Sequence, residues 1–191
     1  GTTFSLNNSS DSIRGGNLNV GTTNGRTTTS GTLTVDGGSI TDAANVNISS
    51  GSTINVKGGG ITLDNTDTWT GNVNVNGGDL ALISVNNKTG SLTQTSGSTF
   101  VLGSGTALNN TSDNISGGNL LIGSNTSGSD LTVKAGNVGY DANVVVYDDS
   151  SLKVDGGTSF KFLVIQGCLI ACDAVYLQDG LDSNNFCIKC S

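Results

Sequence analysis

The chain has 191 residues, a formal net charge of −7, and no His, Met or Pro. Only 5% of the residues are aromatic and 12% are charged, which excludes a basic nucleic-acid surface and the high charge of a disordered chain. Val, Ile and Thr are abundant beside 29 Gly. We therefore expect an all-β chain of many short strands, with Gly, Asn and Ser at the turns.

No apolar run reaches the roughly eighteen residues of a membrane-spanning helix, so we expect no transmembrane segment. Gly1 opens directly into a polar, strand-like segment without a secretory leader, as a processed secreted chain or an excised fragment would. Together with the cysteine content discussed below, this predicts an extracellular or cell-surface location.

The first fifty residues introduce short aliphatic strands separated by Gly-rich turns. After a polar lead-in, the Gly15-Gly16 turn precedes Leu18 and Val20, and a Gly/Thr-rich segment separates these from the next strands. Loops of variable length are tolerated between the strands of a repeat protein. The start of the chain is therefore consistent with a first, irregular repeat.

The segment from Gly31 to Leu63 shows the period most clearly. Single polar residues alternate with aliphatic ones, as in strands, and the distances from Leu33 to Ile54 and from Ile40 to Ile61 are both 21 residues. This predicts a parallel β-helix (β-solenoid) with about three short strands per roughly 21-residue coil. Coils stacked about 4.8 Å apart pool their inward residues, and roughly eight or nine would form a rod about 40 Å long.

The next segment carries a family resemblance. Trp69-Thr70-Gly71 is followed by Val73 and Val75, a Gly-Gly pair, and then Leu80 and Leu82. This pattern resembles the autotransporter-associated β-strand repeat, which reads as an aromatic, Thr-Gly, a β-branched strand, Gly-Gly and a Leu-x-Leu strand. The resemblance covers about twenty residues and implies a right-handed parallel β-helix of the passenger-domain type found on bacterial surfaces.

The chain also repeats itself over a long distance. Residues 6–21 match residues 108–123 at eleven of sixteen positions, 102 residues apart, and residues 31–59 align with residues 129–157 at an offset of 98. We therefore predict one solenoid domain over residues 1–157 with an internal duplication, about residues 6–59 and 108–157. A separate cap segment is expected over residues 158–191.

The cap segment holds all four cysteines, spaced C-x3-C and C-x2-C, and is similar to the cysteine-rich modules of protist and animal surface proteins. An even count in an extracellular chain suggests two disulfides of unknown connectivity, but a four-thiolate zinc site or free thiols would also fit the spacing. We expect no redox catalysis, because no thioredoxin-like context is present. The disulfide candidates are Cys168, Cys172, Cys187 and Cys190.

Apolar residues of the cap segment are expected to cover the last coil. Open strand edges at the end of a solenoid invite association unless they are covered, so a structural cap is the simplest use of this segment. The predicted packing residues are Phe160, Phe162, Val164, Leu169, Ile170 and Leu177.

Catalytic and metal sites are not predicted. The absence of His excludes His-based triads, and the carboxylates are spread along the chain at turns. Asp-Gly and Asn-Gly turns could offer calcium ligands, but the repeat of calcium-binding rolls is absent. We expect no enzyme activity and no cofactor. The carboxylates considered are Asp64, Asp67, Asp79, Asp141, Asp148, Asp149 and Asp155.

The sequence favours an extracellular structural protein, either a fibre subunit that associates end to end or the rod of an adhesin that contacts surface glycans. One alternative is an ice-binding solenoid, although the mixture of Thr, Asn, Ala and Lys at outward positions predicts no single regular face. A carbohydrate-binding or carbohydrate-cleaving β-helix is the other alternative.

Overall fold

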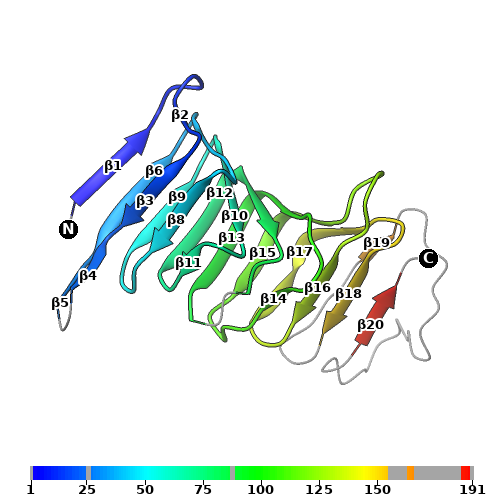
Figure 1. Ribbon diagram of the computed structural model, residues 1–191. Coiled ribbons are helices and arrows are strands. Elements are labelled where there is room, and N and C mark those ends of the chain that lie inside the picture. The colour runs from blue at the N-terminus through cyan, green and yellow to red at the C-terminus, as the bar shows by residue number, and fades with distance from the viewer. Residues whose placement is uncertain (1, 25–26, 87–88, 155–162, 166–185, 190–191) are drawn as a thin grey trace.

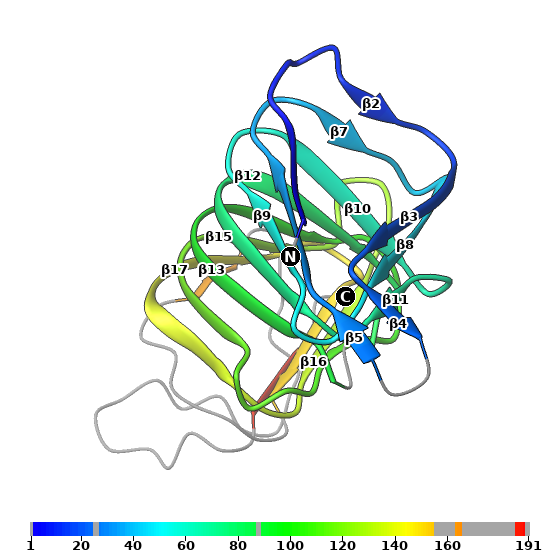
Figure 2. The same cartoon turned by 90° about the vertical axis from the view of Figure 1, so that its left-hand side faces the viewer.

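The computed structural model describes residues 2–24, 27–86, 89–154, 163–165 and 186–189. All regular structure in these ranges is β-strand, and the strands follow one another along a single axis from the N-terminal end (Figure 1). Seen from that end, the coils lie one behind the other around a common interior (Figure 2). The predicted all-β parallel solenoid is therefore confirmed.

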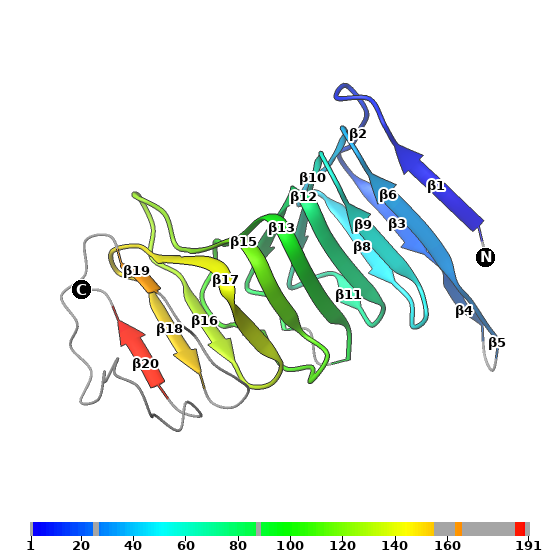
Figure 3. The ribbon, with the colours of Figure 1, turned by 180° about the vertical axis from the view of Figure 1, so that it is seen from behind.

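The first face of the solenoid consists of parallel strands that lie side by side in Figure 3. Its early strands are short and separate, and its later strands are the first halves of longer strands that bend into the next face. The members are β1 (Thr2–Leu6), β6 (Gly31–Val35), β9 (Thr53–Val56), β12 (Asn72–Ile83), β13 (Ser91–Val101), β15 (Asn114–Ile122) and β17 (Asn137–Val146).

The second face continues from the first around one corner. It is formed by three short strands, by the second halves of β12, β13, β15 and β17, and by one late strand paired in parallel with β17. The added members are β2 (Ser12–Ile13), β7 (Ser39–Ile40), β10 (Gly60–Asp64) and β19 (Leu163–Ile165).

The third face is divided into two smaller sheets. The sheet nearer the N-terminus contains β3 (Gly16–Val20), β8 (Ala44–Ile48) and β11 (Thr68–Trp69), all parallel. The later sheet contains β14 (Thr106–Leu108), β16 (Asp130–Val133), β18 (Ser151–Val154) and β20 (Phe186–Lys189). Only β20 runs antiparallel to its neighbour, β18, which marks a change of direction at the C-terminal end of this face (Figure 1). A hairpin of β4 (Thr22–Asn24) and β5 (Thr27–Thr29) stands at one corner.

The predicted coil length is confirmed, but the number of coils is smaller than expected. Thr32 pairs with Thr53 and Ile40 with Ile61, both 21 residues apart, yet Thr2 pairs with Gly31 across a 29-residue first coil. The hairpin of β4 and β5 lengthens that coil. The structure forms about six turns, because loops consume residues that the estimate of eight or nine coils assigned to strands.

Inward side chains form columns along the rod axis. Leu33, Ile54, Val73 and Leu92 stack on the first face and are almost completely buried. Burial of each such aliphatic side chain contributes about 1.5–3 kcal/mol, and no single coil could provide that burial alone. The core is therefore a product of stacking, as the sequence period indicates.

The two copies of the internal repeat lie on different faces. Residues 31–35 form β6 on the first face, whereas the counterparts of residues 32–35, at 130–133, form β16 on the third face. The counterpart of β8, residues 142–146, lies within β17 on the second face. Because an offset of about 100 residues is less than five full turns, the copies are rotated by one face. The three faces therefore accept the same kind of strand.

Candidate functional site

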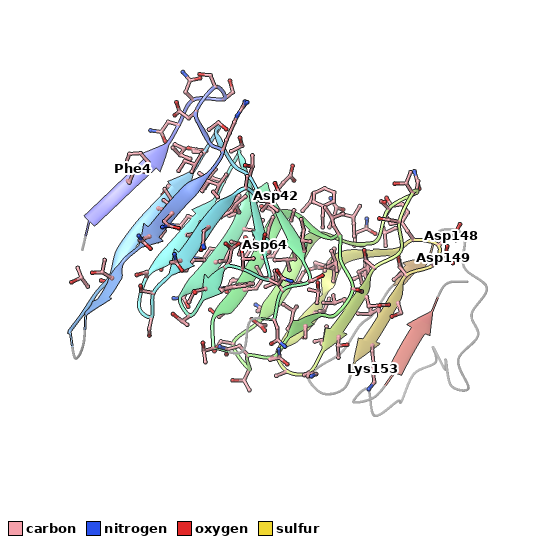
Figure 4. All side chains as sticks on the ribbon, viewed as in Figure 1. Phe4, Asp42, Asp64, Asp148, Asp149 and Lys153 are labelled. Carbon is pink, nitrogen blue, oxygen red and sulfur yellow. The ribbon has the colours of Figure 1, made fainter. Side chains whose placement is uncertain are left out.

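The N-terminal end of the solenoid is an open sheet edge. Strand β1 pairs with β6 on one side and has no strand on the other among the described residues. Phe4 belongs to the inward column that contains Leu33, yet its side chain is 60% exposed while Leu33 is 2% exposed. Figure 4 shows Phe4 at this end of the rod. Among the described residues, the first coil thus leaves one member of a core column exposed.

A recurrent corner turn links successive coils. In the turn from Asp64 to Asp67, the Asp67 Oδ2 atom accepts the Asp64 N–H at 2.8 Å, and Oδ1 accepts the Val46 N–H of the preceding coil at 2.6 Å. In the turn from Asn110 to Asp113, Oδ2 of Asp113 accepts the Asn110 N–H at 3.0 Å, and Oδ1 accepts the Leu92 N–H at 2.8 Å. One carboxylate therefore closes a turn and binds the coil before it.

The first residue of each turn fixes the local backbone. Asp64 Oδ1 accepts the Thr66 N–H at 2.7 Å, and Asn110 Oδ1 accepts the Ser112 N–H at 2.9 Å. Asp and Asn favour such turns because their short side chains reach the backbone two residues further on. The pattern Asx-x-[Ser/Thr]-Asp is visible in the sequence, but its bond to a residue 21 positions earlier is seen only in the structure.

Burial shifts the pKa of one of these carboxyl groups. Desolvation raises the pKa of Asp67 above its ordinary value of 3.8, and the nearby Asp64 charge adds to the rise. The bonds from the Val46 and Asp64 N–H groups oppose it. The corner carboxylates hold the backbone, so they are structural groups rather than acids positioned for catalysis.

The same turn occurs once in the first coil. Asp11 Oδ2 accepts the Asn8 N–H at 3.1 Å, and Asn8 Oδ1 accepts the Ser10 N–H at 3.0 Å. Within the described residues, the other Asp11 carboxylate oxygen accepts no backbone N–H of another coil. Among the described residues, the first coil therefore contains an edge strand, an exposed aromatic side chain and a corner carboxylate with one bonded oxygen.

The outward side of the first face is regular and uncharged. The sequence predicted no regular face, but strand register shows that every outward position from β1 to β13 is Ser, Thr or Asn. The prediction was wrong for these strands, because Ala81 lies on the second face and Lys57 lies just beyond β9, at the end of the first face. The two outward columns are Thr3, Thr32, Thr53, Asn72 and Ser91, and Ser5, Thr34, Asn55, Asn74 and Thr93.

Side-chain hydrogen bonds run along these columns. Asn74 Nδ2 donates to Asn55 Oδ1 at 3.0 Å, and Ser91 Oγ donates to Asn72 Oδ1 at 2.7 Å. A shallow hollow of about 350 Å³ lies where this face meets Lys57 and Asn76. The first face therefore offers an ordered array of hydroxyl and amide groups to solvent.

The outward residues of the second face change from polar to apolar along the rod. Thr62 is followed in register by Ala81, Phe100, Leu121 and Val145. Leu102, at the end of the same region, is 40% exposed. The sequence did not reveal this apolar column, because the run from Phe100 to Leu102 lacks the alternation that separates inward from outward residues.

A hollow of about 300 Å³ lies beside the Asp64 and Asp67 carboxylates, where the third face is interrupted. Asp64, Asp67 and Trp69 line it. Trp69 is buried and donates from Nε1 to the Gly71 carbonyl oxygen at 3.1 Å, so its indole ring is part of the core. Both Asp67 oxygens are occupied by backbone N–H groups. This hollow has no exposed aromatic platform and no free carboxylate pair.

The other predicted carboxylates are not brought together. Asp79, Asp141, Asp148 and Asp149 are exposed, and Figure 4 shows Asp148 and Asp149 far from Asp64. Within the described ranges, no group of three or more His, Cys, Asp or Glu side chains could hold a metal ion. Asp155 lies outside the described residues.

Most of the predicted cap residues also lie outside the described residues. Val164 falls in β19 and Cys187 in β20, where only the backbone is described. The predictions of disulfides and of cap packing remain predictions. The residues outside the description are Phe160, Phe162, Cys168, Leu169, Ile170, Cys172, Leu177 and Cys190.

Comparison with known proteins gives no family assignment. No family model, no curated protein and no solved structure matches the chain. The β-solenoid architecture is consistent with a β-helix repeat and does not identify a named family. In the part of the chain that the structure describes, no helix is long and apolar enough to cross a membrane.

Proposed function

We propose that the protein is an extracellular structural rod whose subunits associate end to end. The observation that carries this proposal is the axial stacking of parallel strands, which among the described residues ends at β1, beside the 60% exposed Phe4. Unpaired parallel edges readily accept another strand, and natural proteins usually protect them. Here the described N-terminal residues provide no such protection.

The remainder of the molecule suits a structural role. Its core is built by stacking, and the corner carboxylates of Asp67 and Asp113 accept backbone N–H groups of the preceding coil. The local resemblance of residues 63–82 to the autotransporter-associated repeat supports a cell-surface location and, as a variant of the same function, an adhesin rod. Paired cysteines in the C-terminal segment would suit an extracellular setting.

Electron microscopy of the purified chain, with and without reductant, tests this function. End-to-end association predicts uniform filaments of rod-shaped subunits. Loss of the filaments in reductant would place the cysteines at the junction. Discrete short rods at all concentrations and under both conditions would refute self-association.

A second candidate function rests on the regular first face. Ranks of hydroxyl and amide groups spaced by the strand separation of about 4.8 Å can order water, or meet the hydroxyl groups of an extended glycan, without any charged group. The observation favouring ice binding is that all ten outward positions from β1 to β13 are Ser, Thr or Asn. Such a protein would act as a monomer.

Thermal hysteresis separates this candidate from the structural rod. If the first face binds ice, Thr53→Lys in the middle of that face should abolish hysteresis, whereas Thr62→Lys on the second face should preserve it. An absence of hysteresis in the unmodified chain would exclude ice binding. Glycan-array binding that is lost only in Thr53→Lys would point instead to an adhesin.

A further inference from the structure

The shallow hollow of about 350 Å³ on the first face lies across three successive coils. Its lining comes from the end of β9 and from the first halves of β12 and β13. Lys57 follows directly after β9, and Asn76 lies beside it because the preceding residues, Val56 and Val75, pair in register. The volume is near the lower end of the range of ligand pockets, roughly 300–1,000 Å³, so it suits a small unit of a larger ligand.

Hydrogen bonds between the coils use the amide oxygens of two residues in this hollow. Asn55 Oδ1 accepts Nδ2 of Asn74 at 3.0 Å, and Asn76 Oδ1 accepts the hydroxyl groups of Thr95 at 3.4 Å and Ser96 at 3.0 Å. Among the described residues, the Nδ2 groups of Asn55 and Asn76 donate to no partner. Because an amide side chain has one acceptor oxygen and one NH₂ group, both residues present mainly donors to a ligand.

Lys57 adds a positive charge to these donors. Its side chain is exposed and forms no ion pair or hydrogen bond with any other described residue. One carboxylate lies next to it in register, that of Asp36, because Val35 pairs with Val56. Asp36 does not line the hollow. The hollow therefore combines one ammonium group with two amide donors, which is the chemistry that binds a carboxylate.

The surface around the hollow restricts the kind of partner. Asn74 Oδ1 and the Thr93 hydroxyl have no hydrogen-bond partner among the described residues, so they can bind hydroxyl groups. The outward positions of the neighbouring strands are Ser, Thr or Asn, without the apolar side chains that form the centre of a protein interface. This surface favours a hydroxyl-rich glycan over a protein as the ligand.

We propose that the hollow binds a carboxylate-bearing sugar unit of an acidic glycan. Lys57 faces the carboxylate, and the Nδ2 groups of Asn55 and Asn76 donate to the acceptor oxygens of the same unit. Hydroxyl groups of the sugar bind Asn74 Oδ1 and Thr93. This inference rests on the extracellular location and the adhesin variant of the proposed function, and it names a ligand class for the first face.

Binding of a single unit is expected to be weak. The hollow is open and no aromatic side chain lines it, so we expect a dissociation constant on the order of 1 mM. Added salt should weaken binding, because the attraction between Lys57 and the carboxylate is exposed to solvent. A long acidic polysaccharide that contacts several rods would bind more tightly, because its later contacts are intramolecular.

Saturation-transfer NMR of the full chain with a tetramer of galacturonic acid tests the site. The method observes the sugar, so it serves for single rods and for filaments alike. A tetramer of galactose is the neutral comparison, and acetate shows whether a carboxylate alone is sufficient. Lys57→Gln should weaken binding of the acidic tetramer about fivefold or more, because the ammonium group is lost. Lys134→Gln is the matched control, since Lys134 is also exposed but lies beyond β16 on the third face.

Asn55→Asp is a second variant, and it keeps the hydrogen bond between the coils. An Asp carboxylate still accepts Asn74 Nδ2, but it replaces the amide donor with a negative charge. Binding of the acidic tetramer should fall about tenfold or more, because like charges repel. Asn125→Asp, in an exposed turn, is the control for the change in net charge. Unchanged thermal unfolding would show that each variant folds.

Binding of the acidic tetramer that exceeds that of the neutral one, falls in Lys57→Gln and Asn55→Asp, and persists in both controls supports the site. Equal binding of the two tetramers, binding that survives both variants, or no binding of either sugar would overturn it. Acetate that competes as well as the tetramer would reveal a simple anion site and overturn the glycan assignment.

Failure of this inference is distinguishable from failure of the proposed association. Single rods that bind the acidic tetramer as described would refute end-to-end association and support the glycan site. Filaments that bind no acidic sugar would support association and overturn the glycan site.

Discussion

At the scale of single residues, buried side chains hold neighbouring coils by accepting backbone N–H groups. Ser52 Oγ accepts the Gly31 N–H at 3.1 Å, and Ser150 Oγ accepts the Ser129 N–H at 3.0 Å. These two pairs are counterparts in the internal duplication, and each spans 21 residues. Both serines are almost completely buried, so water cannot replace them.

We predict that Ser52→Ala and Ser150→Ala each lower the free energy of unfolding by about 1–3 kcal/mol, because each leaves a buried N–H without an acceptor. Ser129→Ala is the control. Its buried Oγ has no hydrogen-bond partner, so its removal should leave stability unchanged or raise it. Urea denaturation measures all three, and equal losses in the three variants would contradict the role given to the serine acceptors.

Close packing of Trp69 gives a second residue-scale prediction. A Cβ atom at Gly90 would lie 2.5 Å from Trp69 Nε1 and 2.8 Å from its carbonyl oxygen. Gly90→Ala should therefore destabilise the chain by about 1–3 kcal/mol. Gly60→Ala is the control, because its nearest neighbour would be the Asp79 carbonyl oxygen at 3.8 Å. A thermal melt of Gly90→Ala that matches that of Gly60→Ala would show that the tryptophan can move aside.

The raised pKa of Asp67 predicts that the stability of the fold depends on pH. Because burial raises its folded-state pKa above 3.8, the folded state binds the proton more tightly than the unfolded state does. The contribution of this proton to stability is complete below about pH 3.8 and is lost as pH rises through the folded-state pKa. Asp67→Asn should lack this component. Unfolding curves between pH 3 and pH 6 measure the free energy of unfolding of the wild type and of Asp67→Asn. The wild-type value minus the variant value should decrease as pH rises. A constant or increasing difference would show that the pKa of Asp67 is not raised.

At the scale of elements, the long strands β13 and β15 bend around a corner that contains a buried polar pair. Gln94 occupies an inward position, and its Nε2 donates to the Gly117 and Asn119 carbonyl oxygens at 2.8 and 3.0 Å. Its Oε1 accepts the Thr99 hydroxyl at 2.5 Å. This network occupies the site where β13 and β15 lose regular pairing between positions 94 and 98.

We predict that Gln94→Leu and Thr99→Val are each destabilising and that their effects are not additive. Either change alone leaves a polar partner unsatisfied in the core, whereas the double variant removes the Gln94–Thr99 pair together. A double-mutant cycle in urea should give an interaction energy of about 0.5–3 kcal/mol. Simple additivity would show that the two side chains act independently.

The sequence period predicted the strands and their pairing, but not the side-chain contacts around them. The spacing of Leu33, Ile40, Ile54 and Ile61 predicts the parallel register that the structure shows. It could not predict the carboxylate bonds of Asp67 and Asp113 to the coil before them, because these depend on where each corner lies above its neighbour. The outward apolar column at Phe100 and the uncharged first face could also be recognised only once the strand register was known. The duplication was visible, but its rotation by one face was not.

At the scale of the whole molecule, the two ends are unlike. The N-terminal end exposes an interior type of coil, whereas at the other end the antiparallel strand β20 covers the edge of β18. The sides of the rod also differ: the first face is polar and uncharged, and the second becomes apolar toward the C-terminal end.

Electron cryomicroscopy of material assembled from the full chain tests this account most directly. We predict filaments of rods joined end to end along the solenoid axis. Phe4 should be buried at that junction. Particles that remain single rods, or subunits joined through their sides with the first coil still exposed, would contradict the account.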